Sequence, residues 1–165
     1  MKKGIFGEKV YHYHRLSSTM EEASVLAAKG EPEGTVVVAE TQSKGRGRWG
    51  RSWLSPEGGL YFSLILKPKE KLIKPIPILS GLSLKRAVRK VTGIASRMKL
   101  PNDILINGKK VAGILLDKKG PFLLLGIGIN TNIKEEQLAE FSATSLSHLT
   151  GKGINNKKLL RTFLQ

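Results

Sequence analysis

A cationic, glycine-rich segment lies between two apolar runs, and this order limits the fold more than any other feature of the chain. The runs at residues 35–39 and 60–66 are rich in β-branched and aromatic residues, so both predict strands. Between them, residues 41–53 contain four cations, three glycines and two tryptophans, and no acidic residue. The segment is therefore predicted to be a loop that joins two strands.

The order of strand, loop and strand helps to decide between several interpretations of the glycines. The spacing Gly45-x-Gly47-x-x-Gly50 satisfies the dinucleotide-binding fingerprint, but that fingerprint must open a helix, and here a strand follows. A kinase glycine loop fits the setting, yet the chain has no His-Arg-Asp or Asp-Phe-Gly sequence. An Arg/Gly segment that grips RNA backbone and a mobile basic loop without a ligand both stay open.

The residue types of the loop suit a phosphorylated ligand. Arginine forks bind phosphate or carboxylate oxygens bidentately, and glycines let backbone N–H groups approach an anion closely. A tryptophan face can support a flat ring such as adenine. We call residues 45–53 the flap, and we expect it to close over a nucleotide phosphate.

The remaining patterns predict one α+β domain with a mixed, largely antiparallel sheet and helices packed on one of its faces. Ser18-Thr-Met-Glu21 is a capping box, with Glu21 reaching back to the helix start, and it opens a helix that runs through Ala28. A second helix is predicted from residues 75–77 to Gly93.

The second half of the chain predicts a hairpin and a C-terminal set of short helices. Asn107-Gly108 favours a type I′ turn between strands at 104–106 and 111–116, because both of its central residues need positive φ. A turn at 117–120 leads into another apolar run, at 121–130.

Charge and composition exclude several classes of protein. The net charge of +15, from 28 basic and 13 acidic residues, suits an anionic substrate, a nucleic acid or a lysine-rich surface. Most lysines, Lys110 among them, stand beside turns, and we assign these to the surface. The chain has no cysteine, so disulfides and thiolate metal sites are excluded. His12, His14 and His148 fit ordinary strand and helix faces better than a zinc site.

Three motifs in order make the chain similar to biotin protein ligase, the biotin–[acetyl-CoA carboxylase] ligase. The flap resembles the adenylate loop of that family. Lys99-Leu-Pro-Asn-Asp103, followed by Lys110-Val-Ala-Gly-Ile-Leu115, resembles its hairpin. Gly126-Ile-Gly-Ile-Asn130 is similar to the strand that lines the nucleotide end of its site. We find that any one motif is weak evidence, whereas the ordered set is strong.

The resemblance implies an ATP-dependent ligase with a class II synthetase-like fold. Biotin would attack the α-phosphorus of MgATP, which gives biotinyl-5′-AMP and pyrophosphate. A lysine of a biotin carboxyl carrier protein would then attack the acyl carbon and release AMP. The implied substrates are biotin and ATP, with Mg²⁺. A cytoplasmic protein is also implied, a homodimer is plausible, and neither DNA nor a membrane is an expected partner; no apolar run approaches the length of a membrane span.

The resemblance also implies roles for individual residues. Lys99 and Arg48 would be the catalytic cations. Biotin would be bound by Ser18, Thr19, Gln42, Gly45, Arg46, Gly47, Arg48, Lys99, Gly113, Ile114, Leu115, Gly126 and Gly128. ATP would be bound by Arg46, Arg48, Arg51, Trp53, Lys99 and Asn130. No residue is assigned to a metal.

The chain departs from the family pattern at two positions and in its extent. Met20 stands where the family often has Asn, and Leu100 replaces a common Trp. Residues 1–165 are interpreted as a catalytic domain alone, without an N-terminal DNA-binding domain or a C-terminal small β-barrel. The alternatives are a lipoate-type ligase, whose Arg-Arg, Gly-Gly-Gly and His-Asp signatures are missing, a catalytically weak biotin-binding remnant, and a basic RNA-binding module.

Overall fold

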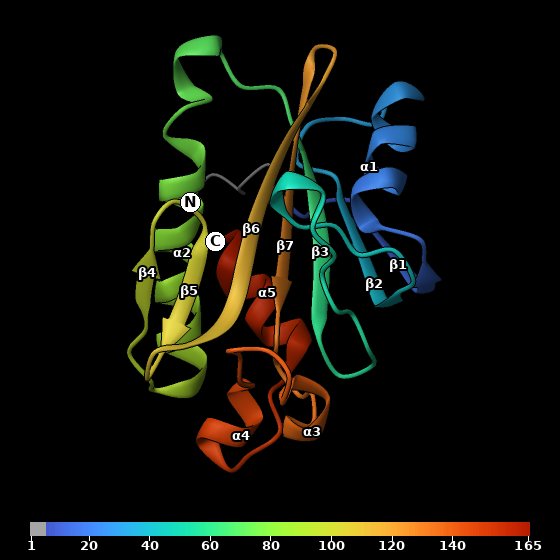
Figure 1. Ribbon diagram of the computed structural model, residues 1–165. Helices are drawn as coiled ribbons and strands as arrows, with labels where there is room; N and C mark the ends of the chain where they lie inside the picture. The colour runs from blue at the N-terminus through green and yellow to red at the C-terminus, as the bar shows by residue number, and fades with distance from the viewer. Residues whose placement is uncertain (1–5) are drawn as a thin grey trace.

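The computed structural model describes residues 6–165 and is built around one seven-stranded open sheet (Figure 1). The elements are β1 Val10–Leu16, α1 Thr19–Ala28, β2 Val36–Gln42, η1 Arg48–Gly50, β3 Leu60–Leu66, η2 Glu70–Leu72, α2 Ile76–Thr92, β4 Arg97–Lys99, β5 Asp103–Ile106, β6 Lys109–Lys119, β7 Phe122–Ile129, α3 Glu135–Leu138, α4 Leu146–Thr150 and α5 Asn156–Leu164. The strand order is β1-β2-β3-β7-β6-β5-β4, in which β1 and β2 are parallel and all other neighbours are antiparallel. The predicted α+β class with a largely antiparallel sheet is confirmed.

Helices cover both faces of this sheet, so the expectation that they pack on one face is wrong. α1 packs on one face, in a cluster that contains Ile65 of β3. α2 and α5 pack on the other face, in a larger cluster that contains Phe62 and Leu64 of the same strand. Every residue of β3 is buried. A strand buried on both sides needs cover on both sides, because its side chains alternate between the faces.

The start of α1 is only partly the predicted capping box. The Ser18 hydroxyl accepts a hydrogen bond from the Met20 N–H at 3.2 Å, which confirms Ser18 as the N-cap. The Glu21 carboxylate, however, accepts from the hydroxyl of Ser17 and does not reach back to Ser18. Ser18 therefore caps the helix through Met20 alone, and the Glu21 carboxylate is bonded by the residue that precedes the cap.

The hairpin between β5 and β6 forms as predicted, whereas the next turn is shorter. Asn107 and Gly108 have φ values of +50° and +77°, as a type I′ turn requires. β6 then continues through residues 117–119, which pair with β7 as far as Lys119 opposite Phe122. The turn predicted at 117–120 is thus confined to Gly120 and Pro121. None of the helices in the described part of the chain is both long and apolar enough to cross a membrane.

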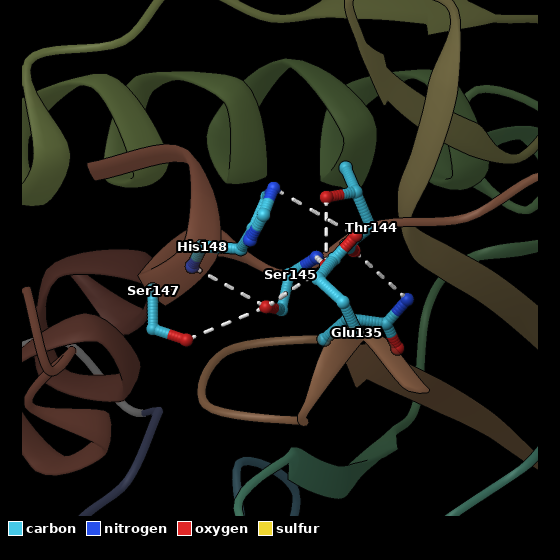
Figure 2. A network of polar contacts seen from close by, with 6 residues as sticks. Glu135, Thr144, Ser145, Ser147 and His148 are labelled. Atoms are coloured by element: carbon cyan, nitrogen blue, oxygen red, sulfur yellow. Dashed lines mark hydrogen bonds and ion pairs between the residues drawn. The ribbon is translucent and has the colours of Figure 1, made fainter. Parts of the chain in front are cut away.

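A polar network after β7 holds the segment 142–145 against the start of β6. Figure 2 shows Glu135 at its centre, accepting from the Thr144 hydroxyl and the Ser145 N–H, both at 3.0 Å. The backbone of Lys110 is clamped as a result: its N–H donates to the Ser142 carbonyl at 2.9 Å, and its carbonyl accepts from the Thr144 N–H at 3.0 Å. The network therefore fixes the backbone of Lys110, which is the point from which its side chain extends.

The charge of Glu135 is expected to make this network sensitive to acid. Burial acts to raise the pKa of Glu135, but the Ser145 N–H, the Thr144 hydroxyl and the positive field of His148 and Lys109 outweigh it, so the folded pKa lies below the ordinary 4.5. A depressed pKa stabilises the fold above the ordinary value, and this contribution disappears as the pH falls through the folded value. Glu135→Gln should lower the free energy of unfolding by about 1 kcal/mol at neutral pH, since a charge-assisted acceptor is lost.

Urea titrations of both proteins from pH 7 to pH 3 measure this difference directly. The gap between the wild type and Glu135→Gln should be full at pH 7 and should close toward pH 3. A gap of constant size across that range would mean that the carboxylate charge has no part in holding the segment.

Candidate functional site

A cavity of about 240 Å³ opens beneath the flap, on the α1 side of the sheet. Its walls come from the start of α1, the end of β2, the flap, and strands β5, β6 and β7. The lining residues are Ser18, Thr19, Met20, Gln42, Arg46, Gly47, Arg48, Trp49, Arg51, Ser52, Trp53, Asn102, Asp103, Lys110, Gly113, Ile114, Leu115, Gly126, Ile127 and Gly128. Segments that lie far apart in the sequence thus meet at one site.

The floor of the cavity is a pair of glycines on neighbouring strands, and Trp53 rests on it. Gly113 and Gly128 face each other in the β6–β7 register. A Cβ on Gly128 would lie 2.4 Å from Trp53 Nε1, and one on Gly113 would lie 2.9 Å from Trp53 Cζ3. Further along β7, a Cβ on Gly126 would lie 2.7 Å from Met20 Sδ. Glycine is required at these positions because the indole ring and the thioether lie directly against the bare backbone.

A methyl group on Gly128 is expected to push Trp53 off this seat. Gly128→Ala should destabilise the fold by about 1–3 kcal/mol, the usual cost of overpacking, and should expose the indole. Tryptophan emission and acrylamide quenching measure the exposure in a Trp49→Phe background, where Trp53 is the remaining tryptophan of the two. Gly153→Ala is the matched control, because nothing lies within 4 Å of its added methyl. Unchanged emission in Gly128→Ala would show that Trp53 does not depend on the glycine floor.

One end of the cavity is lined by a buried polar network at the start of α1. The Thr19 N–H donates to Gln42 Oε1 at 2.8 Å, and the Gln42 amide donates to the Ser55 hydroxyl at 2.8 Å. Behind them, the Ser63 hydroxyl donates to the Thr19 hydroxyl at 2.8 Å. These bonds fix the orientation of the polar groups that face the cavity, so this end can recognise a ligand that carries both donors and acceptors.

The flap itself is a tight reversal of the chain. Arg46 and Ser52 form an antiparallel bridge, and the Arg51 N–H closes the turn on the Arg48 carbonyl at 3.1 Å. Trp49 occupies the turn with φ +58°, which is unusual for a bulky residue, and its side chain is 83% exposed. The Arg48 guanidinium donates to the Asn102 side chain at 3.2 Å, which ties the flap to the turn that precedes β5.

Cations dominate the charge around the cavity. In the described part of the chain, three arginines of the flap and Lys110 line it, against a single lining carboxylate, that of Asp103. Lys110 Nζ lies 2.8 Å from Asp103 Oδ1. Arg46 Nη1 lies 3.7 Å from a carboxylate oxygen of Asp117, on the adjoining part of β6. The excess of positive charge suits an anionic ligand.

Most of the predicted site residues meet at this cavity, and three do not line it. Gly45 is buried next to it, where its carbonyl accepts from the Trp53 N–H at 2.9 Å. The side-chain amide of Asn130 is buried and donates to the carbonyls of Lys110, at 3.4 Å, and Thr144, at 3.2 Å. Lys99 is exposed on the edge strand β4 and borders a separate shallow depression with Arg97 and Asn107. The ligand roles predicted for these residues stay predictions.

The register of the sheet relates Lys99 to the cavity. Lys99 pairs with Asp103, Asp103 with Gly113, and Gly113 with Gly128. Residues opposite each other across a sheet direct their side chains to the same face. Lys99 therefore lies on the cavity side of the sheet, one strand beyond Asp103.

The structure adds cavity residues that the sequence interpretation did not assign to a ligand. Among them are Met20, Trp49, Asn102, Asp103 and Lys110. The assignment of Lys110 to the protein surface is wrong, because its ammonium lies inside the cavity wall beside Asp103 and Trp53. Position beside the Asn107-Gly108 turn suggested exposure, whereas the register of β5 and β6 shifts between Ile104 and Leu105, so that Lys110 pairs with Leu105 on the same face as Asp103.

Fold and cavity together define an α+β domain with a positively charged cavity between a cationic flap and a glycine-floored sheet. The model of the biotin/lipoate A/B protein ligase family matches residues 13–133, and the chain belongs to that family. The predicted resemblance to biotin protein ligases is confirmed by individual relatives.

The bifunctional ligase/repressor BirA of Bacillus subtilis is 38% identical over 176 aligned residues, which cover 99% of this chain and 54% of the relative. The biotin–[acetyl-CoA-carboxylase] ligase of Paracoccus denitrificans is 38% identical over 125 residues, which cover 70% of this chain and 52% of the relative. The biotin protein ligase of Aquifex aeolicus, solved in complex with biotin and ATP, superposes with a TM-score of 0.85 at 40% identity, covering 95% of this chain and 67% of that one. The chain spans about half the length of the two curated relatives, 54% and 52%.

Proposed function

We propose that this chain activates biotin with ATP to form biotinyl-5′-AMP and transfers the biotinyl group to a lysine of a biotin carboxyl carrier protein. The observation that carries the proposal is one continuous cavity with two chemically different ends. The polar groups of Ser18, Thr19 and Gln42 line it near Gly126, which pairs with Ser63, the partner of the Thr19 hydroxyl. The Trp53 indole lies two residues further along β7, on Gly128, and the cations line the same cavity. A polar bicyclic acid and a nucleotide fit such a pair of ends.

The first half-reaction joins two anions, so its barrier is largely electrostatic. A biotin carboxylate oxygen attacks the α-phosphorus, the bond from the α-phosphorus to the bridging oxygen breaks, and pyrophosphate leaves with that oxygen. Negative charge grows on the phosphoryl oxygens as this happens. Arg46, Arg48 and Arg51 supply positive charge at the cavity, which would stabilise the growing negative charge.

The polar end of the cavity matches the ureido ring of biotin, which presents both donors and acceptors. Ser18 and Thr19 are only 1% and 3% exposed. A ligand that binds at this end therefore displaces little bulk water from them. Met20 contributes a thioether where the family often has an amide. We therefore expect biotin to be held here by the hydroxyls and by Gln42, with apolar contact from Met20.

Mg²⁺ is proposed to bind as part of the nucleotide substrate. Among the described residues there is no group of three potential carboxylate, imidazole or thiolate ligands, and the one lining carboxylate, Asp103, is already paired with Lys110. Mg²⁺ commonly keeps several waters and binds mainly to substrate phosphates. The residues thus fit MgATP as the substrate, with the ion held by its phosphates and water.

The flap must move in this scheme. The cavity of about 240 Å³ is smaller than the 300–1,000 Å³ of typical small-molecule sites, and two substrates have to enter it. The contacts of Arg48 with Asn102 and of Arg46 with Asp117 are polar and solvent-accessible, so they open at small cost.

Exchange of labelled pyrophosphate into ATP tests the proposal. Exchange that requires biotin and is not supported by lipoate is the expected result. Exchange with lipoate would identify a lipoate-type ligase, and tight biotin binding without exchange would identify a remnant. Retention on single-stranded RNA with a steep loss at higher salt, without biotin binding, would favour the RNA-binding module.

A further inference from the structure

Among the described residues, Lys110 is the one lysine in the cavity wall, and no role in the predicted site accounts for it. Its Nζ lies 2.8 Å from Asp103 Oδ1 and 5.0 Å from the centroid of the Trp53 ring. The side chain is 31% exposed. Its ammonium is therefore held next to the ring proposed to support adenine, and it is open to a ligand from the cavity.

The hydrogen bonding around Lys110 is incomplete in the described part of the chain. The buried Asp103 Oδ1 is in direct contact with the ammonium and has no other polar partner in the described part of the chain. The buried Trp53 Nε1 has no acceptor among the described residues. One polar group without a partner, the indole N–H, thus lies beside the ammonium, although buried polar atoms are normally paired.

The backbone of Lys110, by contrast, is fixed from three sides. Ser142 and Thr144 bond its N–H and its carbonyl, and the Asn130 amide donates to the same carbonyl. The base of the side chain is therefore rigid while its four-carbon stem can swing. This combination suits a charge that changes partner when a ligand arrives.

We propose that Lys110 contacts the phosphate of the bound nucleotide, with Asp103 as the partner that holds its ammonium between substrates. The inference rests on the proposed function for the identity of the nucleotide. A phosphate bears more negative charge than one carboxylate, and a partly exposed ion pair costs little to break. Asn130 then acts as a positioning residue that sets the base of the Lys110 side chain.

ATP and adenosine affinities of variants test the phosphate contact. Lys110→Met should weaken ATP binding, measured by calorimetry, by about 10- to 100-fold, the scale of a charged hydrogen bond. Adenosine, measured as a competitor of ATP, should lose less than about twofold, because it lacks the phosphate. Lys110→Arg should restore part of the ATP affinity. Lys90→Met is the control: it removes an exposed lysine of α2, which does not line the cavity.

A second variant separates phosphate binding from a structural ion pair. Asp103→Asn should tighten ATP binding by about two- to fivefold, because the ammonium is released and a negative charge leaves the phosphate site. If the ion pair only stabilised the fold, Asp103→Asn and Lys110→Met would weaken ATP alike.

Equal losses for ATP and adenosine in Lys110→Met, or ATP affinity equal to that of Lys90→Met, would overturn the inference. These results differ from a failure of the proposed function. A wild type that binds ATP without biotin-dependent exchange refutes the ligase and leaves the Lys110 contact testable. Normal exchange with an unaffected Lys110→Met refutes the contact alone.

Discussion

Replacing Arg48 with alanine is expected to slow the formation of biotinyl-5′-AMP by roughly 100- to 1,000-fold, the usual effect of removing one stabiliser of transition-state charge. Arg48 lies on the flap, lines the cavity and is aimed at Asn102 by a hydrogen bond of 3.2 Å. Because charge grows on the phosphoryl oxygens only during reaction, the variant should lose catalytic rate more than affinity for biotin.

Single-turnover measurements with saturating biotin and ATP read this rate directly. Arg48→Lys should recover only part of the loss, since an ammonium keeps the charge but not the planar fork. Arg89→Ala serves as the control, because Arg89 is an exposed arginine of α2 outside the cavity. An Arg48→Ala rate within twofold of the Arg89→Ala rate would show that the flap takes no part in the reaction.

Replacing Lys99 with alanine is expected to slow the same step by roughly 100-fold or more. The resemblance to biotin protein ligases is the reason for this expectation, and the register is compatible with it. Lys99 shares the cavity face of the sheet with Asp103 and Gly113, although its side chain does not line the cavity. Its ammonium can act only if the stem folds back across Asp103 toward the substrates.

The comparison of Lys99→Ala with Lys90→Ala, an exposed lysine of α2, isolates this effect from the loss of one positive charge. Pyrophosphate exchange gives the rate, and biotin titration gives the affinity. A Lys99→Ala enzyme with near-normal exchange would exclude Lys99 from the reaction. The cations that line the cavity would then be the groups that stabilise the transition-state charge.

Lys99 and Lys110 are expected to affect different properties of the enzyme. Lys99 is expected to affect the reaction rate, whereas Lys110 is expected to affect affinity for the nucleotide phosphate. A Lys110→Met variant that lost only rate, together with a Lys99→Ala variant that lost only ATP affinity, would reverse the two roles.

Local patterns were enough to predict most elements of the fold. The strand at 60–66, the helix that ends at Gly93 and the type I′ turn at Asn107-Gly108 all form where the sequence indicates, because short-range periodicity and turn chemistry determine them. The placement of α1 and α2 on opposite faces could not be predicted in this way, although the largely apolar sequence of β3 was a usable signal.

The site was predictable as a set of motifs and less so as a geometry. The sequence motifs predict that Arg48, Trp53 and Gly128 belong to one site, and in the structure all three line one cavity. The sequence could not reveal that Gly113 and Gly128 pair across two strands and contact Trp53, because strand register is a tertiary property. Lys110 escaped notice for a similar reason: a register shift between β5 and β6 places it opposite Leu105, on the face that carries Asp103.

A crystal structure of the chain with biotinyl-5′-AMP tests the central claim most directly. The account predicts the ureido ring beside Ser18 and Gln42, the adenine on Trp53 and the phosphate within reach of the flap arginines. A complex with the ligand bound away from the flap, or with the nucleotide and biotin ends reversed, would contradict it.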